Sequence, residues 1–237
     1  MKITVVGAGR AGTSFFLALG DAGHDVALVH HEDRVDLAGQ DVVILCVPDD
    51  ALEETSHTLA RGDYVVAHVA GSRGLEVLAP HARVASLHPL VALPSGRLGA
   101  RRLRGATYCV AGDALVREVV ASLDGHARTI SDADRSLYHA TATVAANHVV
   151  ALLGQVSELA ERLGLSMADF LPLARQALED VERVGPVEAL TGPASRGDVA
   201  TIDAHLNALP EAERAAYVAM AHVAFELAER RRSQQPA

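Results

Sequence analysis

The amino-acid sequence predicts an α/β protein in which a doubly wound, mainly parallel sheet is followed by an all-α domain. In the first half, short apolar runs alternate with helical patterns, which is typical of a parallel sheet covered on both faces. No convincing strand follows residue 130. We therefore expect two domains, an α/β domain at residues 1–130 and an α-helical domain at residues 131–237.

The expected elements follow one another closely along the chain. In the first domain we expect strands at 3–6, 26–29, 42–47, 64–69, 83–87, 107–110 and 127–130, and helices at 10–21, 49–60, 74–79 and 115–123. The arginine-rich stretch 94–104 is expected to be a loop. In the second domain we expect helices from 131 to 154 or 163, and at 167–184, 198–209 and 211–231.

Composition excludes several classes of protein. Of the 237 residues 49% are apolar and 22% are charged, which suits a globular chain with a sizeable core. The net charge of −9 argues against a nucleic-acid partner. The apolar run 42–47 is too short to cross a bilayer, and the N-terminus enters a strand pattern without a signal peptide. We therefore expect a cytoplasmic protein with no membrane partner.

Three glycines stand between the first expected strand and the first expected helix, in the pattern GxGxxG. In this context the pattern is a dinucleotide-binding fingerprint. The first glycine permits a tight turn, the second lets the backbone approach a pyrophosphate, and the third lets helix and strand pack closely. The free N–H groups of the helix N-terminus also favour phosphate. We therefore predict that the pyrophosphate contacts Gly7, Gly9, Arg10, Ala11 and Gly12.

The end of the second expected strand bears on the choice of nucleotide. An NAD site places an acid there, whereas a basic side chain suits the additional phosphate of NADP. No acid stands at the strand tip, and His31 and Arg34 follow it as candidate partners of the 2′-phosphate. NADP is therefore the predicted cofactor. Glu32 keeps NAD possible.

Three further strand ends should border the ligand crevice, because open α/β sheets bind ligands beyond the carboxyl ends of their strands. Val47 and Pro48 are expected to flank the nicotinamide ribose, and Gly71 to allow close approach to the cofactor. Ser72 is a candidate substrate-binding residue. His88 could donate to a substrate oxygen or could serve as a structural cap.

A stripe of polar residues marks the first expected helix of the second domain. His139, Thr143 and Asn147 recur every four residues on an otherwise apolar helix, so they share a face that meets either a protein segment or a ligand. We favour a substrate site in which His139 and Asn147 are catalytic and Thr143 binds the substrate. In the loop 190–198, Arg196 could clamp a substrate carboxylate.

Other chemistries find little support. None of the twelve histidines forms an HExxH motif or a zinc-binding spacing, so no metal is expected. Lys2 is the only lysine and opens the first strand, which excludes a Schiff-base or Walker lysine. Cys46 and Cys109 lie in apolar strand-like runs and are expected to be free, buried thiols.

These motifs, taken together, resemble a known group of proteins. Their order is GxGxxG at 7–12, VPDD at 47–50, HVAGS at 68–72, LHPL at 87–90, HATATVAANHVVALL at 139–153 and LTGPASRGD at 190–198. Over nearly the whole chain this resembles the Rossmann-like NADP-binding proteins that carry a C-terminal helical domain of unknown function. These are similar to the 6-phosphogluconate dehydrogenase C-terminal-like superfamily, alongside ketopantoate reductases and pyrroline-5-carboxylate reductases. Ala70 departs from the serine that relatives often carry.

The resemblance implies an NADP-dependent reductase of a small molecule, with a 2-keto acid such as ketopantoate as the expected substrate. An imine or pyrroline-carboxylate type reductase and a non-catalytic NADP-sensing regulatory protein are the alternatives. Ordinary ketopantoate reductases use a lysine on the first helix of their second domain, and His139 occupies a comparable place here. A histidine can serve as a general acid near neutral pH. We also expect a homodimer formed through the helical domain.

Overall fold

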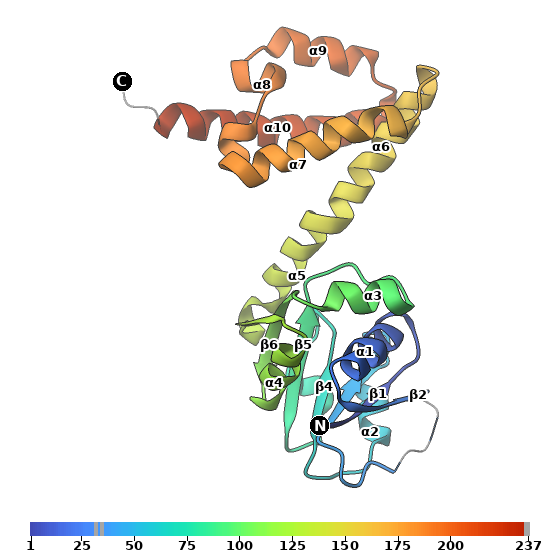
Figure 1. The fold of residues 1–237 in the computed structure, drawn as a ribbon. Coiled ribbons are helices and arrows are strands. Elements are labelled where there is room, and N and C mark those ends of the chain that lie inside the picture. The colour runs from blue at the N-terminus through green and yellow to red at the C-terminus, as the bar shows by residue number, and fades with distance from the viewer. Residues whose placement is uncertain (31–32, 34–35, 235–237) are drawn as a thin grey trace. The chain divides into compact units, whose positions relative to one another are not determined.

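The computed structural model describes residues 1–30, 33 and 36–234, and it contains two compact units, Met1–His148 and Val149–Ala237. The first unit is built on a seven-stranded sheet with the strand order β2-β1-β3-β4-β5-β6-β7 (Figure 1). All neighbouring strands are parallel except β5 and β6, which pair antiparallel. This confirms the predicted mainly parallel sheet followed by helices.

The seven strands lie close to their expected positions. They are β1 (Lys2–Val6), β2 (Asp25–Val29), β3 (Val42–Leu45), β4 (Val65–His68), β5 (Val84–Pro89), β6 (Thr107–Gly112) and β7 (His126–Thr129). Strands β3 and β4 are buried along their whole length. Their continuous burial explains why β3 is apolar throughout, and β4 apolar up to His68, instead of showing an alternating pattern.

Helices of the first unit cover both faces of the sheet. They are α1 (Arg10–Asp21), α2 (Leu52–Thr58), the 3₁₀ turn η1 (Leu75–Leu78), α3 (Gly96–Leu103), α4 (Leu115–Ser122), the 3₁₀ turn η2 (Asp132–Asp134), α5 (Arg135–Thr143) and the π-helical segment η3 (Val144–His148). Since successive strand residues point to opposite faces, the sheet has two cores. Ile44 and Leu87 pack beneath α1, α3 and α4, whereas Leu45 packs beneath α2 and η1.

The expected loop at 94–104 is wrong, because α3 occupies most of it. The helix packs closely on α1: a Cβ atom added to Gly99 would lie 2.0 Å from the Ser14 hydroxyl oxygen. Leu103 is fully buried in the core, while Arg97 pairs with Asp21 at 2.7 Å on the surface. The helix is therefore stabilised by tertiary packing, which sequence composition did not reveal.

The second unit is helical throughout its described residues outside short connections. Its helices are α6 (Val149–Arg162), α7 (Met167–Ala189), α8 (Gly192–Arg196), α9 (Val199–Ala208) and α10 (Glu211–Gln234). Helical geometry within α7 breaks at Gly185, whose φ of +78° agrees with the expected helix end at 184. The short helix α8 was expected to be loop. Among the described residues, no helix is long and apolar enough to cross a membrane.

Candidate active site

The glycine loop after β1 has the geometry that each of its glycines requires. Gly7 has a φ of +102°, and a Cβ atom there would lie 2.6 Å from the Cys46 carbonyl oxygen. A Cβ atom on Gly12 would lie 1.7 Å from the Gly7 carbonyl oxygen, so packing of the turn demands this glycine too. At Gly9, by contrast, nothing lies within 4 Å of the added atom. The fold therefore does not need Gly9, and the space beside it is open to a ligand.

Helix α1 begins directly after Gly9 and points its N-terminus at that space. The first intrahelical backbone bond runs from the Thr13 N–H to the Gly9 carbonyl at 3.0 Å. The preceding N–H groups, those of Arg10, Ala11 and Gly12, are consequently available to an anion. No acidic side chain stands in the first turn. The loop and helix start thus fit a dinucleotide pyrophosphate.

The residues predicted to select NADP cannot be placed. His31 and Arg34 lie outside the described residues. Strand β2 ends at Val29, and the His30 N–H donates to the Asp33 carboxylate at 2.9 Å. The preference for NADP over NAD therefore stays a prediction from the sequence.

A polar cluster lies on the second face of the sheet, near the carboxyl ends of β4 and β5. His68 is paired with Ser86 across β4 and β5, and His88 with Cys109 across β5 and β6. Helix α5 supplies three more polar side chains, Arg135, Tyr138 and His139, which contact this group. Five of these seven residues were not singled out in the sequence as parts of a site: His68, Ser86, Cys109, Arg135 and Tyr138.

His68 is a neutral histidine whose two ring nitrogens both hydrogen-bond to the loop that follows β4. Its Nδ1 accepts the Ala70 N–H at 3.2 Å, so its Nε2–H donates to the Gly74 carbonyl at 3.1 Å. Burial lowers the pKa of His68 to about 4, and the charge of Arg135 acts in the same direction. Both ring nitrogens are thereby satisfied without a proton being added, which fixes the loop that carries Gly71.

His88 is also held neutral. Its Nδ1 lies 2.5 Å from the hydroxyl oxygen of Tyr138, and the two rings meet edge to face at 5.5 Å. The pKa of His88 is lowered to about 4, mainly by burial and in smaller part by neighbouring His139, whereas Asp49 opposes the shift. At neutral pH this imidazole can donate a hydrogen bond but holds no extra proton to transfer.

Gly71 separates the two histidines predicted for the site. The His88 and His139 ring centroids are 6.2 Å apart. A Cβ atom on Gly71 would lie 2.7 Å from His139 Nδ1 and 2.9 Å from His88 Nε2. The buried His139 Nδ1 has no hydrogen-bond partner among the described residues. We predicted that Gly71 allows close approach of the cofactor. In the structure, the lack of a Cβ atom at Gly71 leaves room for the rings of His88 and His139.

Arg135 anchors the start of α5 to the sheet. The residue is only 2% exposed, and its guanidinium donates to the Ser86 hydroxyl at 3.1 Å and to Asp132 at 2.9 Å. Its Nη1 is buried and has no partner among the described residues. A buried positive charge at this position helps to keep both His68 and His88 unprotonated.

A cavity of about 530 Å³ opens beside these histidines, and we call it the two-histidine cavity. It is lined by His88, Pro89, Leu90, Val91, Ala92, Tyr138, His139, Thr141, Ala142, Thr143, Ala145, Ala146 and Asn147. The predicted stripe of His139, Thr143 and Asn147 therefore reaches one cavity. It does so although the helix becomes π-helical after Thr143, and such segments are frequent at functional sites.

The remaining predicted residues fall elsewhere. Val47 and Pro48 follow β3, at the same sheet edge as the glycine loop. Ser72 donates to the Asp49 carboxylate and so ties the loops after β3 and β4 together, but it does not line the two-histidine cavity. Arg196 is exposed on α8 of the second unit. The roles of these residues stay predictions.

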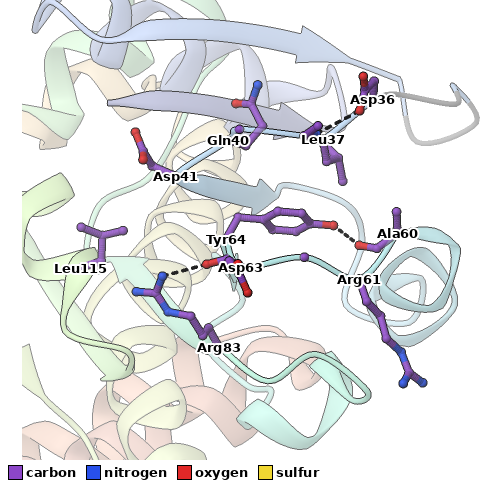
Figure 2. Close-up of a pocket in the computed structure, with 13 residues that line it drawn as sticks. Asp36, Leu37, Gln40, Asp41, Ala60, Arg61, Asp63, Tyr64, Arg83 and Leu115 are labelled. Atoms are coloured by element: carbon purple, nitrogen blue, oxygen red, sulfur yellow. Dashed lines mark hydrogen bonds between the residues drawn. The ribbon is translucent and has the colours of Figure 1, made fainter.

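A second cavity, of about 620 Å³, lies at the opposite edge of the sheet, where strands β3, β4 and β5 begin (Figure 2). Two of its polar side chains, those of Tyr64 and Arg83, already have partners. The Tyr64 hydroxyl donates to the Ala60 carbonyl, and Arg83 donates to the Asp63 carbonyl at 2.8 Å. Nucleotides bind at the carboxyl edge of such sheets, so we place the candidate active site in the two-histidine cavity.

Two further observations bear on chemistry. No group of three or more histidine, cysteine, aspartate or glutamate side chains is placed to hold a metal ion in the part of the chain that the structure describes. Cys46 and Cys109 are both buried, free thiols.

The comparisons with known proteins agree with the predicted resemblance. Residues 108–224 match a family described as a domain of unknown function (DUF2520). No curated protein matches the chain. A structure assigned as an NADP oxidoreductase from Bacteroides fragilis is 19% identical, with a TM-score of 0.76 over 95% of this chain and 98% of that chain.

Two other solved structures are similar over nearly their whole length. A Thermotoga maritima protein is 21% identical, with a TM-score of 0.77 over 97% of this chain and 99% of that chain. An imine reductase from Streptomyces aurantiacus is 17% identical, with a TM-score of 0.66 over the same shares. The chain therefore has a Rossmann-type sheet followed by a C-terminal helical domain.

Because two imidazole rings pack against Gly71, the effect of adding a methyl group there in Gly71→Ala can be predicted. Gly71→Ala should displace both imidazoles, because contacts below 3 Å from a Cβ atom are not tolerated. A displacement of about 1 Å at reacting groups can cost about 10²-fold in rate, so turnover of the substrate should fall by roughly that factor. Gly20→Ala, where the added methyl meets nothing within 4 Å, is the matched control. Unchanged turnover in Gly71→Ala would show that the rings do not act in catalysis.

Proposed function

We propose that this protein is an NADP-dependent reductase that transfers a hydride to a small carbonyl or imine compound. One observation carries the proposal: a glycine loop with open space at Gly9 and a cavity with two histidines belong to the same sheet and to its carboxyl edge. The similar folds of an NADP oxidoreductase and an imine reductase support the choice of cofactor and reaction.

Each residue of the site has a separate role in the proposed reaction. Bound NADPH would supply the hydride, held by the glycine loop and the N-terminus of α1, with Val47 and Pro48 beside the nicotinamide ribose. His88 donates a hydrogen bond to the substrate oxygen or nitrogen while staying neutral. His139 supplies the proton, because a histidine with a pKa of about 4, such as His88, is almost never protonated at pH 7. Asn147 orients the reacting group.

The lining of the cavity bears on the substrate. Its described residues include neither arginine nor lysine, and most are alanine, leucine, valine or proline. A 2-keto acid would bring a carboxylate, for which arginine is the preferred partner. The cavity therefore favours an uncharged ketone or a cyclic imine, which places the imine alternative ahead of ketopantoate. Arg196, which the sequence suggested as a partner for a substrate carboxylate, does not line this cavity.

NADPH oxidation in the presence of ketones, cyclic imines and 2-keto acids, ketopantoate included, tests the function. We expect the fastest oxidation with a ketone or cyclic imine. A sensor protein needs only the glycine loop and no polar donors beside the nicotinamide. Tight NADPH binding without oxidation by any of these compounds would therefore favour the sensor.

We predict that NADPH binds more tightly than NADH. The reason is the absence of an acid at the tip of the second strand and the presence of Arg34 just beyond it. Arg34→Ala should reduce the preference, as measured by fluorescence titration of both nucleotides. Arg61→Ala, at the opposite edge of the sheet, controls for the loss of one positive charge. Equal affinities of the wild-type protein for NADPH and NADH would contradict the prediction.

The dimer is also part of the proposal. In the second unit, large apolar side chains are exposed on α7 and α10, among them Leu173 at 66% and Val218 at 50%. Exposed apolar surface of this kind commonly marks an interaction site. It supports a homodimer formed through the helical domain.

A further inference from the structure

We propose that Tyr138 is a positioning residue that holds His88 in one tautomer, with the ring proton on Nε2. The proposal deepens the proposed function, on which its kinetic part rests, because it explains how a neutral histidine is made ready to donate. The tautomer itself is a property of the free protein. It can therefore be measured whether or not the protein is a reductase.

The two side chains are placed to form a hydrogen bond with each other. The Tyr138 oxygen lies 2.5 Å from His88 Nδ1, and the ring planes meet at 84°. Either the phenol donates to an unprotonated Nδ1, or a protonated Nδ1 donates to the phenol oxygen. The surroundings of the pair distinguish these two cases.

Cys109 is the second neighbour of the phenol. It faces His88 across the antiparallel β5–β6 pair and lies close enough to the phenol to help raise the pKa of Tyr138. Of the two acceptors within reach of the phenol proton, an imidazole nitrogen is much stronger than sulfur. His88 Nδ1 is also the partner of the one hydrogen bond that the Tyr138 hydroxyl makes among the described residues, so the phenol donates to His88.

Burial keeps both partners in the states that this arrangement needs. It raises the pKa of Tyr138, so the phenol remains a donor at neutral pH. It lowers the pKa of His88, assisted by His139, Arg135 and His68 and opposed by Asp49, so the ring is neutral and one of its nitrogens is free to accept. With Nδ1 occupied in this way, the single proton of the neutral ring must be on Nε2.

The Nε2 atom of His88 lies on the side of the ring that faces Gly71 in the candidate active site. His139 Nδ1 also lies beside Gly71. The same ring borders the two-histidine cavity. Tyr138 consequently binds Nδ1 and leaves the proton on Nε2, the nitrogen that can donate to a ligand. The orienting partners of other functional histidines act in the same way.

The chain offers a matched control. His205 Nδ1 lies 2.6 Å from the Tyr217 oxygen, with ring planes at 84°, in the second unit. Tyr217→Phe therefore removes the same kind of hydrogen bond from a histidine outside the candidate site. Each Tyr→Phe variant should affect the tautomer of its own histidine and leave the other unchanged.

The experiment is ¹⁵N NMR of histidine-labelled protein without cofactor, at neutral pH. In the wild-type protein His88 should show a protonated Nε2 and an unprotonated Nδ1. In Tyr138→Phe it should show a mixture of both tautomers, and in Tyr217→Phe it should look like the wild type. Tyr138→Phe should also lower kcat by about 10- to 100-fold, with NADPH affinity unchanged.

Two outcomes would overturn the proposal: a proton on Nδ1 of His88 in the wild type, or an unchanged tautomer in Tyr138→Phe. The wild-type spectrum decides the first even if the variant does not fold. If the protein reduces no substrate but the tautomer shifts as expected, the positioning role stands and the reductase function fails. If the protein reduces a substrate and the tautomer does not respond to Tyr138→Phe, the reductase function stands and the positioning role fails.

Discussion

Replacing His139 with alanine should lower turnover by roughly 10²- to 10⁴-fold and leave NADPH affinity almost unchanged. The expected size follows from the role assigned to this side chain, since positioned proton transfer typically contributes that much. His139 lines the two-histidine cavity, and the chain has no lysine except Lys2 on β1 to take the role. Steady-state kinetics with saturating NADPH and a responsive substrate provide the measurement.

Two other histidines make this test specific. His88→Ala removes a neutral hydrogen-bond donor and should lower turnover less than His139→Ala does. His148→Ala removes an exposed histidine of the π-helical segment η3 that does not line the cavity, and it should have no effect. If His88→Ala abolishes turnover while His139→Ala leaves it intact, the proton donor is the histidine of β5.

Gly9→Val should abolish NADPH binding in a protein that remains folded. A branched side chain would occupy the space that the pyrophosphate needs, next to the N-terminus of α1. The fold should tolerate it, because the added Cβ meets nothing within 4 Å and the residue has an ordinary φ of −73°. Fluorescence titration of NADPH gives the affinity, and circular dichroism gives the folded state.

A valine in place of Gly20 on the same helix provides the control, since a Cβ atom there is equally free of contacts. Gly20→Val should bind NADPH as the wild type does. Normal binding by Gly9→Val would place the phosphate site elsewhere on the protein. Loss of folding in both variants would instead show that α1 does not accept branched residues.

The order of strands and helices could be predicted because most of the buried strands are short, mainly apolar runs between turn residues. Strand β3 and helix α1 are examples in which the pattern and the structure agree closely. Helix α3 could not be predicted. Its residues include two glycines and three arginines, and it is held by close packing on α1 that local sequence does not encode.

The candidate site was predictable only where polar residues interrupt a pattern. His139, Thr143 and Asn147 interrupt an apolar helix and line one cavity, although η3 departs from the α-helical spacing on which the prediction relied. Ser86 and His88 interrupt β5 at alternate positions, which marks one face of a strand, but the short run hides the pattern. Tyr138 gives no such signal, because its role depends on a contact with His88 fifty residues away.

Transfer of deuterium from NADPH labelled at C4 tests the central claim most directly. The protein would be incubated with each labelled C4 epimer and a ketone, a cyclic imine or ketopantoate, and the product analysed by mass spectrometry. We predict one deuterium at the former carbonyl or imine carbon with one epimer, and greatly reduced formation of this product in His139→Ala. Tight binding of NADPH with no deuterium in any product would contradict the account.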